Sequence, residues 1–481
     1  IRDREGTGEG GVELAMFTSR IKGLDELAEK TFNPYSLVVI GGHPGAGKTT
    51  LAVSICADNM ERGEKCLYIS FQEDKDKLYS MMRNIGIDLE EYEDKGLFKF
   101  IRLPVTLKPS EVMQVINDLV VTEKPRMIVI DSVTPVLDSL LVEPRKRAMV
   151  QNYMYNLPKS INGVVILLAE LPFGEENLRL GNIEFVADML ILLKYRLERG
   201  LLVREMEIKK ARGSHLRLAK IPFAITSRGF RTFPAPTTQD IRVGGEGRYT
   251  LSYPVLRDYI GYVNKGETIL VSCQPDARFL QSIYIVLDLV ATNRLRGLFI
   301  TYRYGAEEAK NLIKEALLAL GVSGGEAEEF IRKYVEIRSI NPSGTSMTEL
   351  LAYETLMAEE RKPDLVLFHG IDVFESIVDH KTYFSELLNE LFTLKKMGII
   401  VARYGNITSE EFYRRNASLS DIVVKGLFTD KCGGKTLGAP GMCFYLWRRG
   451  RKPIYVSEHE ALAEDNLKAL KMSIVKAIED G

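Results

Sequence analysis

A short glycine-rich segment near the start of the chain has the residue types and the spacing that phosphate binding requires. It satisfies the pattern G-x-x-x-x-G-K-[ST] with Gly42, His43, Pro44, Gly45, Ala46, Gly47, Lys48 and Thr49, followed by Thr50. Glycine lets backbone N–H groups turn toward phosphate oxygens that a Cβ atom would keep away. Lys48 can reach the β- and γ-phosphates of a nucleotide, and the Thr49 hydroxyl can ligate Mg²⁺. We therefore expect this segment, the phosphate loop, to bind ATP and Mg²⁺.

Two apolar segments end in side chains that would complete such a site. Met127–Ile130 is followed by Asp131, the residue type that holds the Mg²⁺ shell in phosphate-loop enzymes. A second segment ends at Gln72 and Glu73; Glu73 is the candidate base, and Gln72 could orient water. Strand ends also carry such residues as turn caps or solvated acids, so these roles depend on the phosphate loop.

Alternating apolar runs and amphipathic stretches predict the elements that position these residues. The predicted strands are Ser36–Ile40, Cys66–Ser70, Met127–Ile130, Val164–Leu168 and Met189–Leu193. Helices are expected between them, for example over Thr49–Met60 and Glu111–Thr122. Strands that alternate with helices indicate an α/β fold, a mostly parallel twisted sheet flanked by helices.

The pattern starts again in the second half of the chain. Lys124–Asp131 resembles Lys362–His369, and Cys66–Phe71 resembles Gly297–Tyr302, at offsets of 231 to 238 residues. We therefore expect a leader over residues 1–17, tandem domains over 18–235 and 249–481, and a linker over 236–248.

Several motifs together resemble the KaiC-like branch of the RecA superfamily, over about Thr18 to Pro234. The matching segments are Gly23–Leu27, Phe71–Glu73, Glu184–Asp188, Glu207–His215 and Ile221–Ile225. The resemblance implies tandem RecA-like P-loop domains of an archaeal type. Members of that family usually form hexameric rings with ATP between neighbouring subunits. It also implies that Lys210 and Arg212 reach the γ-phosphate of the adjacent subunit, although a solvated basic strand end is the simpler alternative.

One residue departs from the family pattern. The first acid of the family's Phe-Glu-Glu motif usually serves as the base, and Gln72 stands there in this chain. An amide is not a base, so either Glu73 takes over or hydrolysis of ATP is slow.

The second half lacks the chemistry of the first. Arg278–Leu280 aligns with Gly47–Thr49, Tyr304 with Glu73, and His369 with Asp131. We therefore expect a degenerate domain. The basic cluster Trp447–Arg451 aligns near Lys210 and could contact a neighbouring subunit, an acidic partner or nucleic acid.

Bulk properties narrow the classes of protein. The chain has 481 residues with a net charge of -1, which gives no global attraction to nucleic acid or to anionic membranes. The five cysteines lack metal-ligand spacing, which predicts free thiols in a reducing cytoplasm. No stretch reaches the roughly 20 apolar residues of a membrane helix, and no secretory signal is evident.

Three functions fit these residues. The first is a slow, Mg²⁺-dependent ATP hydrolase that acts as a regulatory or signalling switch in an oligomeric ring, with an unknown protein partner. The second is a nucleotide-sensing regulator, of the transcriptional or gas-vesicle type, with little hydrolysis. The third is a RecA-like, DNA-associated ATPase, which the net charge disfavours.

Overall fold

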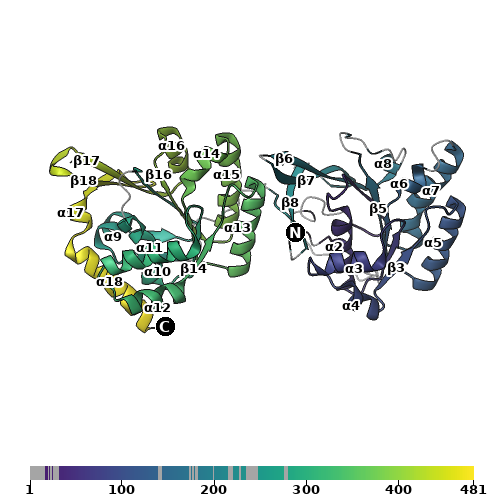
Figure 1. Cartoon of the computed structure of the whole chain (residues 1–481), viewed down its shortest axis with the longest axis horizontal. Helices are drawn as coiled ribbons and strands as arrows, with labels where there is room; N and C mark the ends of the chain where they lie inside the picture. The colour runs from purple at the N-terminus through teal and green to yellow at the C-terminus, as the bar shows by residue number, and fades with distance from the viewer. Residues whose placement is uncertain are drawn as a thin grey trace, which may run out of the picture. The chain divides into compact units, whose positions relative to one another are not determined.

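The computed structural model of the chain divides into two compact units, residues 1–235 and 236–481. It describes residues 17–19, 21, 24, 32–138, 143–172, 175, 178, 183–198, 200–214, 220–226, 229–234, 247–275 and 280–480. Each unit is built on one large sheet (Figure 1).

In the described residues, the sheet of the first unit has nine strands in the order β3-β2-β4-β5-β1-β6-β7-β8-β9. The strands are β1 (Leu37–Gly42), β2 (Cys66–Ser70), β3 (Phe98–Arg102), β4 (Met127–Asp131), β5 (Val164–Glu170), β6 (Met189–Glu198), β7 (Leu201–Ala211), β8 (Lys220–Thr226) and β9 (Gly229–Thr232). Strands β1 to β6 pair in parallel, and β7 to β9 add an antiparallel extension. The central strands β1 and β2 are buried along their whole length, as a parallel sheet covered on both faces requires.

Helices cover both faces of this sheet. They are α2 (Lys48–Met60), α3 (Lys75–Arg83), α4 (Leu89–Asp94), α5 (Pro109–Glu123), α6 (Thr134–Asp138), α7 (Pro144–Ser160) and α8 (Ile183–Val186). Alternate strand residues separate into two cores: Val38 and Ile40 pack with α2 and α3, whereas Leu37 and Val39 pack with α5 and α7. Side chains of a strand point alternately to opposite faces, so β1 contributes to both cores.

The described part of the second unit has an eight-stranded sheet in the order β14-β13-β15-β16-β12-β17-β18-β19 and a two-stranded sheet, β10-β11. The strands are β10 (Arg248–Thr250), β11 (Tyr262–Asn264), β12 (Thr268–Cys273), β13 (Gly297–Thr301), β14 (Val335–Ser339), β15 (Leu365–His369), β16 (Ile400–Asn406), β17 (Ile422–Cys432), β18 (Lys435–Arg448) and β19 (Ile454–Ser457). The helices are α9 (Pro254–Ile260), α10 (Tyr284–Asn293), α11 (Ala306–Ala319), α12 (Gly324–Tyr334), α13 (Met347–Arg361), α14 (Phe374–Ile377), α15 (His380–Lys396), α16 (Glu410–Ser418), α17 (Glu458–Ala461) and α18 (Glu464–Glu479), with 3₁₀ turns over Leu280–Ile283 and Ile371–Val373.

The two large sheets share their strand order, from β3-β2-β4-β5-β1-β6-β7 in the first to β14-β13-β15-β16-β12-β17-β18 in the second. Even a local turn recurs: Ser70 Oγ accepts from the Glu73 N–H at 2.9 Å, and Thr301 Oγ1 accepts from the Tyr304 N–H at 3.2 Å. The predicted fold class, two mostly parallel sheets flanked by helices, is confirmed. The shared order supports a duplicated domain.

The prediction of five free thiols is wrong for Cys432 and Cys443, which form a disulfide between β17 and β18, whereas Cys56, Cys66 and Cys273 are free and buried. Cys432 and Cys443 come together because β17 and β18 are adjacent antiparallel strands. The spacing of the cysteines in the sequence did not reveal this pairing. The expected linker lies outside the described residues except Gly247 and Arg248, and Arg248 begins β10.

Candidate functional site

The residues expected to bind a nucleotide gather at the carboxyl edge of the first sheet. Strand β1 ends at Gly42, which pairs with Glu170 of β5 on one side and with Leu193 of β6 on the other. Asp131 ends β4 and pairs with Ser70 of β2. Parallel strands end at the same edge, and ligands of open α/β sheets bind at that edge.

The phosphate loop has the backbone that its glycines allow. Gly45 and Gly47 have φ angles of 74° and 99°, in the left-handed region that L side chains rarely adopt. A Cβ atom on Gly47 would lie 2.7 Å from Ile225 Cδ1. Helix α2 begins directly after Gly47, and among the described residues no side chain caps its N-terminus. Its first N–H groups and its positive dipole end are therefore available to an anion.

Lys48 folds back over this loop. Its Nζ donates to the Gly42 carbonyl at 3.0 Å and to the His43 carbonyl at 3.2 Å. Burial lowers the pKa of the Lys48 ammonium, and the charges of Glu170 and Asp131 act in the opposite direction. A partly buried cation beside two carbonyls can exchange them for phosphate oxygens at little cost in desolvation.

Thr49, Asp131 and Tyr68 form a connected polar group. The Thr49 hydroxyl donates to Asp131 Oδ2 at 3.0 Å, and the Tyr68 hydroxyl donates to the same oxygen. Burial raises the pKa of the Asp131 carboxyl, while Tyr68, Thr49 and Lys48 favour its charged form. Sequence reasoning missed Tyr68; the signal was a phenol in an otherwise apolar strand, Cys66–Ile69.

Glu73 lies after β2, beside the Asp131 position. Its backbone N–H donates to Ser70 Oγ at 2.9 Å, and its carboxylate forms an ion pair of 2.8 Å with Lys77. Glu73 is near enough to Asp131 for its charge to raise the pKa of that carboxyl. Gln72 is exposed. The geometry therefore brings Glu73 to the edge that holds the phosphate loop, with Gln72 facing solvent.

Glu170 also lies at this edge of the sheet. It ends β5, the strand that lies between β1 and β4, and its N–H donates to the Thr134 hydroxyl at 2.9 Å. Two negative charges raise the pKa of Lys48, and that of Glu170 has a larger effect than that of Asp131. Glu170 therefore lies between the phosphate loop and Asp131.

Comparison with known proteins agrees with this geometry. Residues 17–237 match the family model described as "ATPase: KaiC". The first unit is a KaiC-like ATPase domain of the RecA superfamily.

Its curated relatives include three circadian clock proteins. The circadian clock oscillator protein KaiC of Rippkaea orientalis is 26% identical over 227 residues, 47% of this chain and 42% of that protein. KaiC of Parathermosynechococcus lividus is 27% identical over 198 residues, 41% of this chain and 37% of its own length. KaiC 1 of Synechocystis sp. is 25% identical over 201 residues, 42% and 39% of the two chains. The chain thus aligns with less than half the length of these relatives.

The metal expected in this KaiC-like domain suits the residues present. Among the described residues, no group of three or more His, Cys, Asp or Glu side chains could hold a metal alone. Mg²⁺ is commonly held by one or two protein oxygens, substrate phosphates and water. The adjacent Thr49 hydroxyl and Asp131 carboxylate match that requirement.

Lys210 and Arg212 lie at the other edge of the KaiC-like domain. Lys210 pairs with Leu190 near the start of β6, whereas Gly42 of the phosphate loop pairs with Leu193 further along that strand. Lys210 Nζ donates to the Phe185 carbonyl at 2.5 Å, and Arg212 donates to the same carbonyl at 2.9 Å. The structure does not bring these two cations to the phosphate loop of their own domain.

Equivalent contacts recur in the second unit. The Arg212 N–H donates to the Asp188 carbonyl at 2.8 Å, and the Arg449 N–H donates to the Asp421 carbonyl at 2.9 Å. Both arginines also pair with the carboxylate of that aspartate. The basic cluster of the second unit is therefore engaged internally: Arg449 pairs with Asp421, and Arg448 pairs with Glu267 at 3.1 Å.

Strand register places His369 where the KaiC-like domain has Asp131, since His369 pairs with Thr301 as Asp131 pairs with Ser70. Of the residues aligned with the phosphate loop, Arg278 and Phe279 lie outside the described residues. The opening motif Gly23–Leu27 is described only at Leu24, and His215 is not described.

In the part of the chain that the structure describes, none of the helices has the length and the apolar character needed to cross a membrane.

Proposed function

We propose that the first unit hydrolyses MgATP slowly, with the phosphate loop as the binding site. The observation that supports this most directly is the convergence of half-buried Lys48, Thr49 and Asp131 at one sheet edge. Lys48 offers a positive charge to the β- and γ-phosphates, and the glycine backbone leaves room for them. Bound Mg²⁺ would neutralise the charge that develops on the transferred phosphoryl group.

Glu73 is the proposed base. Its carboxylate can accept a proton from the attacking water, which the Gln72 amide cannot do. In the structure Glu73 is paired with Lys77. When Glu73 accepts a proton from water, it loses its ion pair with Lys77. This loss costs little free energy, because an exposed ion pair contributes only about 0.2–1 kcal/mol. Glu170, beside Lys48 and the phosphate loop, is the alternative base.

The proposed assembly is a homo-oligomeric ring, expected to be a hexamer, in which Lys210 and Arg212 act on the nucleotide of a neighbour. Their position supports this proposal, because they lie at the sheet edge away from their own phosphate loop. Arg212 has a side chain that is 50% exposed. The named clock proteins among the relatives support a regulatory or signalling role for such a ring, working through a protein partner in the cytoplasm.

A nucleotide sensor with little hydrolysis is the second candidate function. The observation that favours it is Gln72, exposed and without basic chemistry at the position where the family carries its usual base. Such a protein would bind MgATP with the same residues and signal by its bound state.

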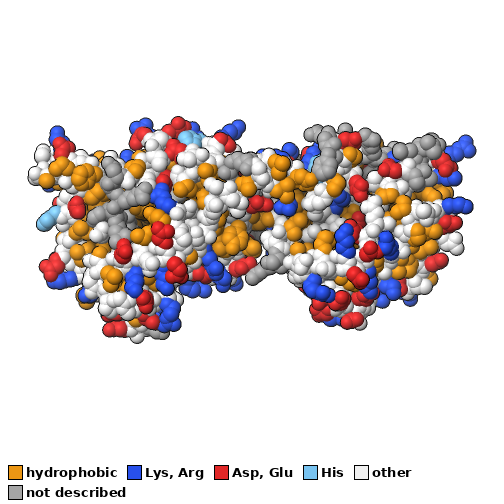
Figure 2. Space-filling view, viewed as in Figure 1, with side chains coloured by type: hydrophobic (Ala, Val, Ile, Leu, Met, Phe, Trp, Pro, Cys, Tyr) orange, Lys and Arg blue, Asp and Glu red, His pale blue; other side chains and the backbone are white. Residues whose placement is uncertain are grey.

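A DNA-associated ATPase is less well supported. The surface visible in Figure 2 interleaves Lys and Arg with Asp and Glu, and the net charge is -1. Binding to nucleic acid depends on clustered positive charge and falls steeply with salt.

Phosphate release from MgATP by the purified full chain tests the proposal. We expect slow, Mg²⁺-dependent release that disappears in Lys48→Ala and persists in the exposed control Lys159→Ala. Tight MgATP binding without release would support the sensor. Absence of both binding and release would refute both functions.

A further inference from the structure

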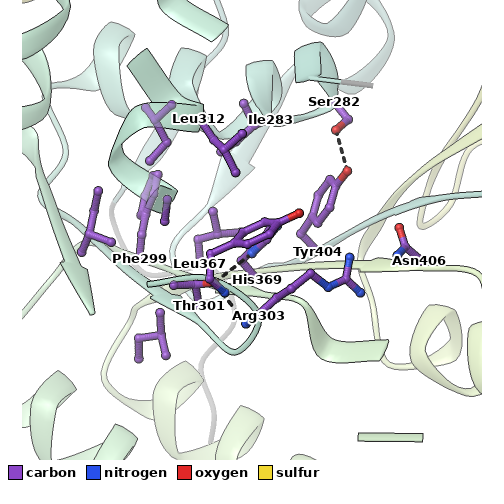
Figure 3. A pocket seen from close by; sticks show the side chains of 15 residues that line it. Ser282, Ile283, Phe299, Thr301, Arg303, Leu312, Leu367, His369, Tyr404 and Asn406 are labelled. Carbon is purple, nitrogen blue, oxygen red and sulfur yellow. Dashed lines mark hydrogen bonds between the residues drawn. The ribbon is translucent and has the colours of Figure 1, made fainter. Parts of the chain in front are cut away.

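The second unit contains an open cavity of about 270 Å³ at the carboxyl edge of its sheet (Figure 3). The cavity lies where the KaiC-like domain gathers its nucleotide-site residues. Arg303 and Tyr304 follow β13 as Gln72 and Glu73 follow β2, and His369 ends β15 as Asp131 ends β4. The edge has kept a concave site but changed its chemistry.

Two strand positions that line the cavity carry different side chains from the matching positions of the first unit. In the first unit the Tyr68 ring stacks on Phe100 at 5.9 Å and its hydroxyl reaches Asp131. In the matching register of the second unit, Phe299 pairs with Ile337. A ring without a hydroxyl and a smaller aliphatic neighbour occupy less of this space, and both line the cavity.

One end of the cavity is apolar. In Figure 3, Phe299 and Leu312 lie on the opposite side of the cavity from Tyr404 and Asn406. Further apolar lining comes from Ala309, Ile313, Ile337 and Leu367. An apolar group placed there would gain dispersion contacts with these walls.

Aromatic rings form the wall beside it. The His369 ring lies between Tyr304 and Tyr404, with centroid distances of 5.4 and 5.1 Å and interplanar angles of 24° and 23°. Thr301 Oγ1 is 3.1 Å from His369 Nδ1, and Ser282 donates to the Tyr404 hydroxyl at 3.1 Å. These contacts fix the rings in place, and fixed ring faces favour an aromatic ligand.

At the polar end of the described lining, the positive charge of Arg303 is already engaged by a carboxylate. Arg303 is the cation of the lining, and its guanidinium forms an ion pair with buried Asp372. With its amide turned, Asn406 also accepts from Arg303, at 2.9 and 3.1 Å. The described lining contains no lysine and no carboxylate. A phosphate group would have to compete with Asp372, so a nucleotide is a poor fit.

We propose that this cavity binds an uncharged aromatic small molecule of about two fused rings that carries a hydrogen-bonding group. The size follows from a comparison: an apolar cavity of about 150 Å³ holds benzene. The rings would lie against Phe299 and Leu312, with the polar group toward Tyr404 and Asn406. The second unit is then a ligand-binding domain that has lost nucleotide chemistry.

The test uses 2-naphthol as the probe, with calorimetric titration of the full chain. We expect one saturable site per chain that MgATP does not compete for. The matched ligand 2-naphthalenesulfonate has the same rings but an anionic group, and we expect it to bind at least about 10-fold more weakly. Equal binding of the two probes, or displacement of 2-naphthol by MgATP, would overturn the proposal.

Two substitutions on α11 locate the site. Leu312→Trp places extra volume into the cavity and should weaken 2-naphthol binding by roughly 10-fold or more. Leu318 lies on the same helix, is 44% exposed and does not line the cavity, so Leu318→Trp should change affinity less than about 2-fold. Circular dichroism melting checks that both variants fold, and Ala309→Met is a second cavity-filling variant if Leu312→Trp does not. Unchanged binding in a folded, cavity-filled variant would refute the site.

Discussion

The Thr49 hydroxyl donates a hydrogen bond of 3.0 Å to the Asp131 carboxylate, although the two residues lie 82 positions apart in the chain. The contact joins the first turn of α2 to the end of β4 across β5. It sets two oxygens side by side at the edge where the phosphate loop lies, which is the arrangement that a shared Mg²⁺ requires.

Removal of the Tyr68 hydroxyl should raise the Mg²⁺ concentration that phosphate release requires. Tyr68→Phe deletes one hydrogen bond to Asp131 Oδ2 and keeps the ring packing on Phe100. Burial already raises the pKa of Asp131, and loss of a donor that favours the carboxylate raises it further. We expect the Mg²⁺ concentration for half-maximal phosphate release to rise roughly 3- to 10-fold.

The control is Tyr79→Phe, since the Tyr79 hydroxyl bonds to Glu93 instead. The defect of Tyr68→Phe should grow as the pH falls, because a group with a raised pKa is protonated first. A lower Mg²⁺ requirement in Tyr68→Phe would mean that the hydroxyl competes with the metal.

Nucleotide binding should depend on Lys48 and should be confined to the first unit. Lys48→Ala removes the ammonium that lies over the Gly42 and His43 carbonyls. We expect MgATP affinity to fall by roughly 30-fold or more, since a charge-assisted contact with phosphate is lost. Calorimetry should give one nucleotide per wild-type chain. Two equivalent sites per chain, or equal affinity in Lys48→Ala, would contradict the assignment.

Turnover should need Glu73. Glu73→Gln keeps the size of the side chain but removes the proton acceptor, so phosphate release should fall by roughly 100-fold or more while MgATP still binds. The matched control is Asp74→Asn, a neighbouring exposed carboxylate that pairs with Arg102. Unchanged release in Glu73→Gln combined with loss in Glu170→Gln would move the base to Glu170.

The stability of the second unit should fall as the pH rises through neutrality. Glu390 of α15 is buried against Glu354 of α13, with Arg403, Tyr383 and Tyr302 around the pair. Burial raises the pKa of Glu390 to about 7, and it raises the pKa of Glu354 as well. The folded state therefore binds more protons than the unfolded chain above pH 4.5.

The free energy of unfolding should accordingly decrease between about pH 5 and about pH 8, on the order of 1–3 kcal/mol. Glu390→Gln should flatten this decrease, whereas the exposed control Glu315→Gln should keep it. Urea denaturation at several pH values measures the effect. The assignment would be contradicted if the free energy of unfolding rose over this pH range and Glu390→Gln abolished that rise.

Parts of this picture could be predicted from the sequence because they are local. The phosphate loop is a continuous motif, and the apolar runs that end at Ser70 and Asp131 mark strands by their length and flanking residues. Offsets between repeated runs predicted that His369 would lie where Asp131 lies, and the strand register agrees.

Other parts depend on strand order, which local patterns do not determine. Glu170 became central because β5 lies between β1 and β4. The contact of Tyr68 with Asp131 depends on parallel pairing of β2 with β4. Side chains from several neighbouring strands leave the volume beside Phe299 unfilled. The spacing of residues within one segment does not predict such a cavity.

The assembly prediction concerns Arg212, which lies at the sheet edge away from its own phosphate loop and binds the Phe185 carbonyl. If Arg212 instead stabilises charge on a neighbour's γ-phosphate, Arg212→Ala chains and Lys48→Ala chains should each be inactive for different reasons. A cation supplied in this way has an effect of roughly 10³-fold or more in related chemistry.

Mixing the two inactive variants is the decisive measurement. In mixed oligomers, an intact phosphate loop from Arg212→Ala can meet an intact Arg212 from Lys48→Ala, and such an interface should restore part of the phosphate release. Equal mixing in a ring gives this productive pairing at about one interface in four, so recovery should approach a quarter of the wild-type rate. The control mixes Lys48→Ala with a Lys48→Ala, Arg212→Ala double variant, which contains no intact loop. A mixture that forms mixed oligomers by native mass spectrometry yet stays inactive, or a monomer that hydrolyses ATP at the full rate, would rule out the shared site.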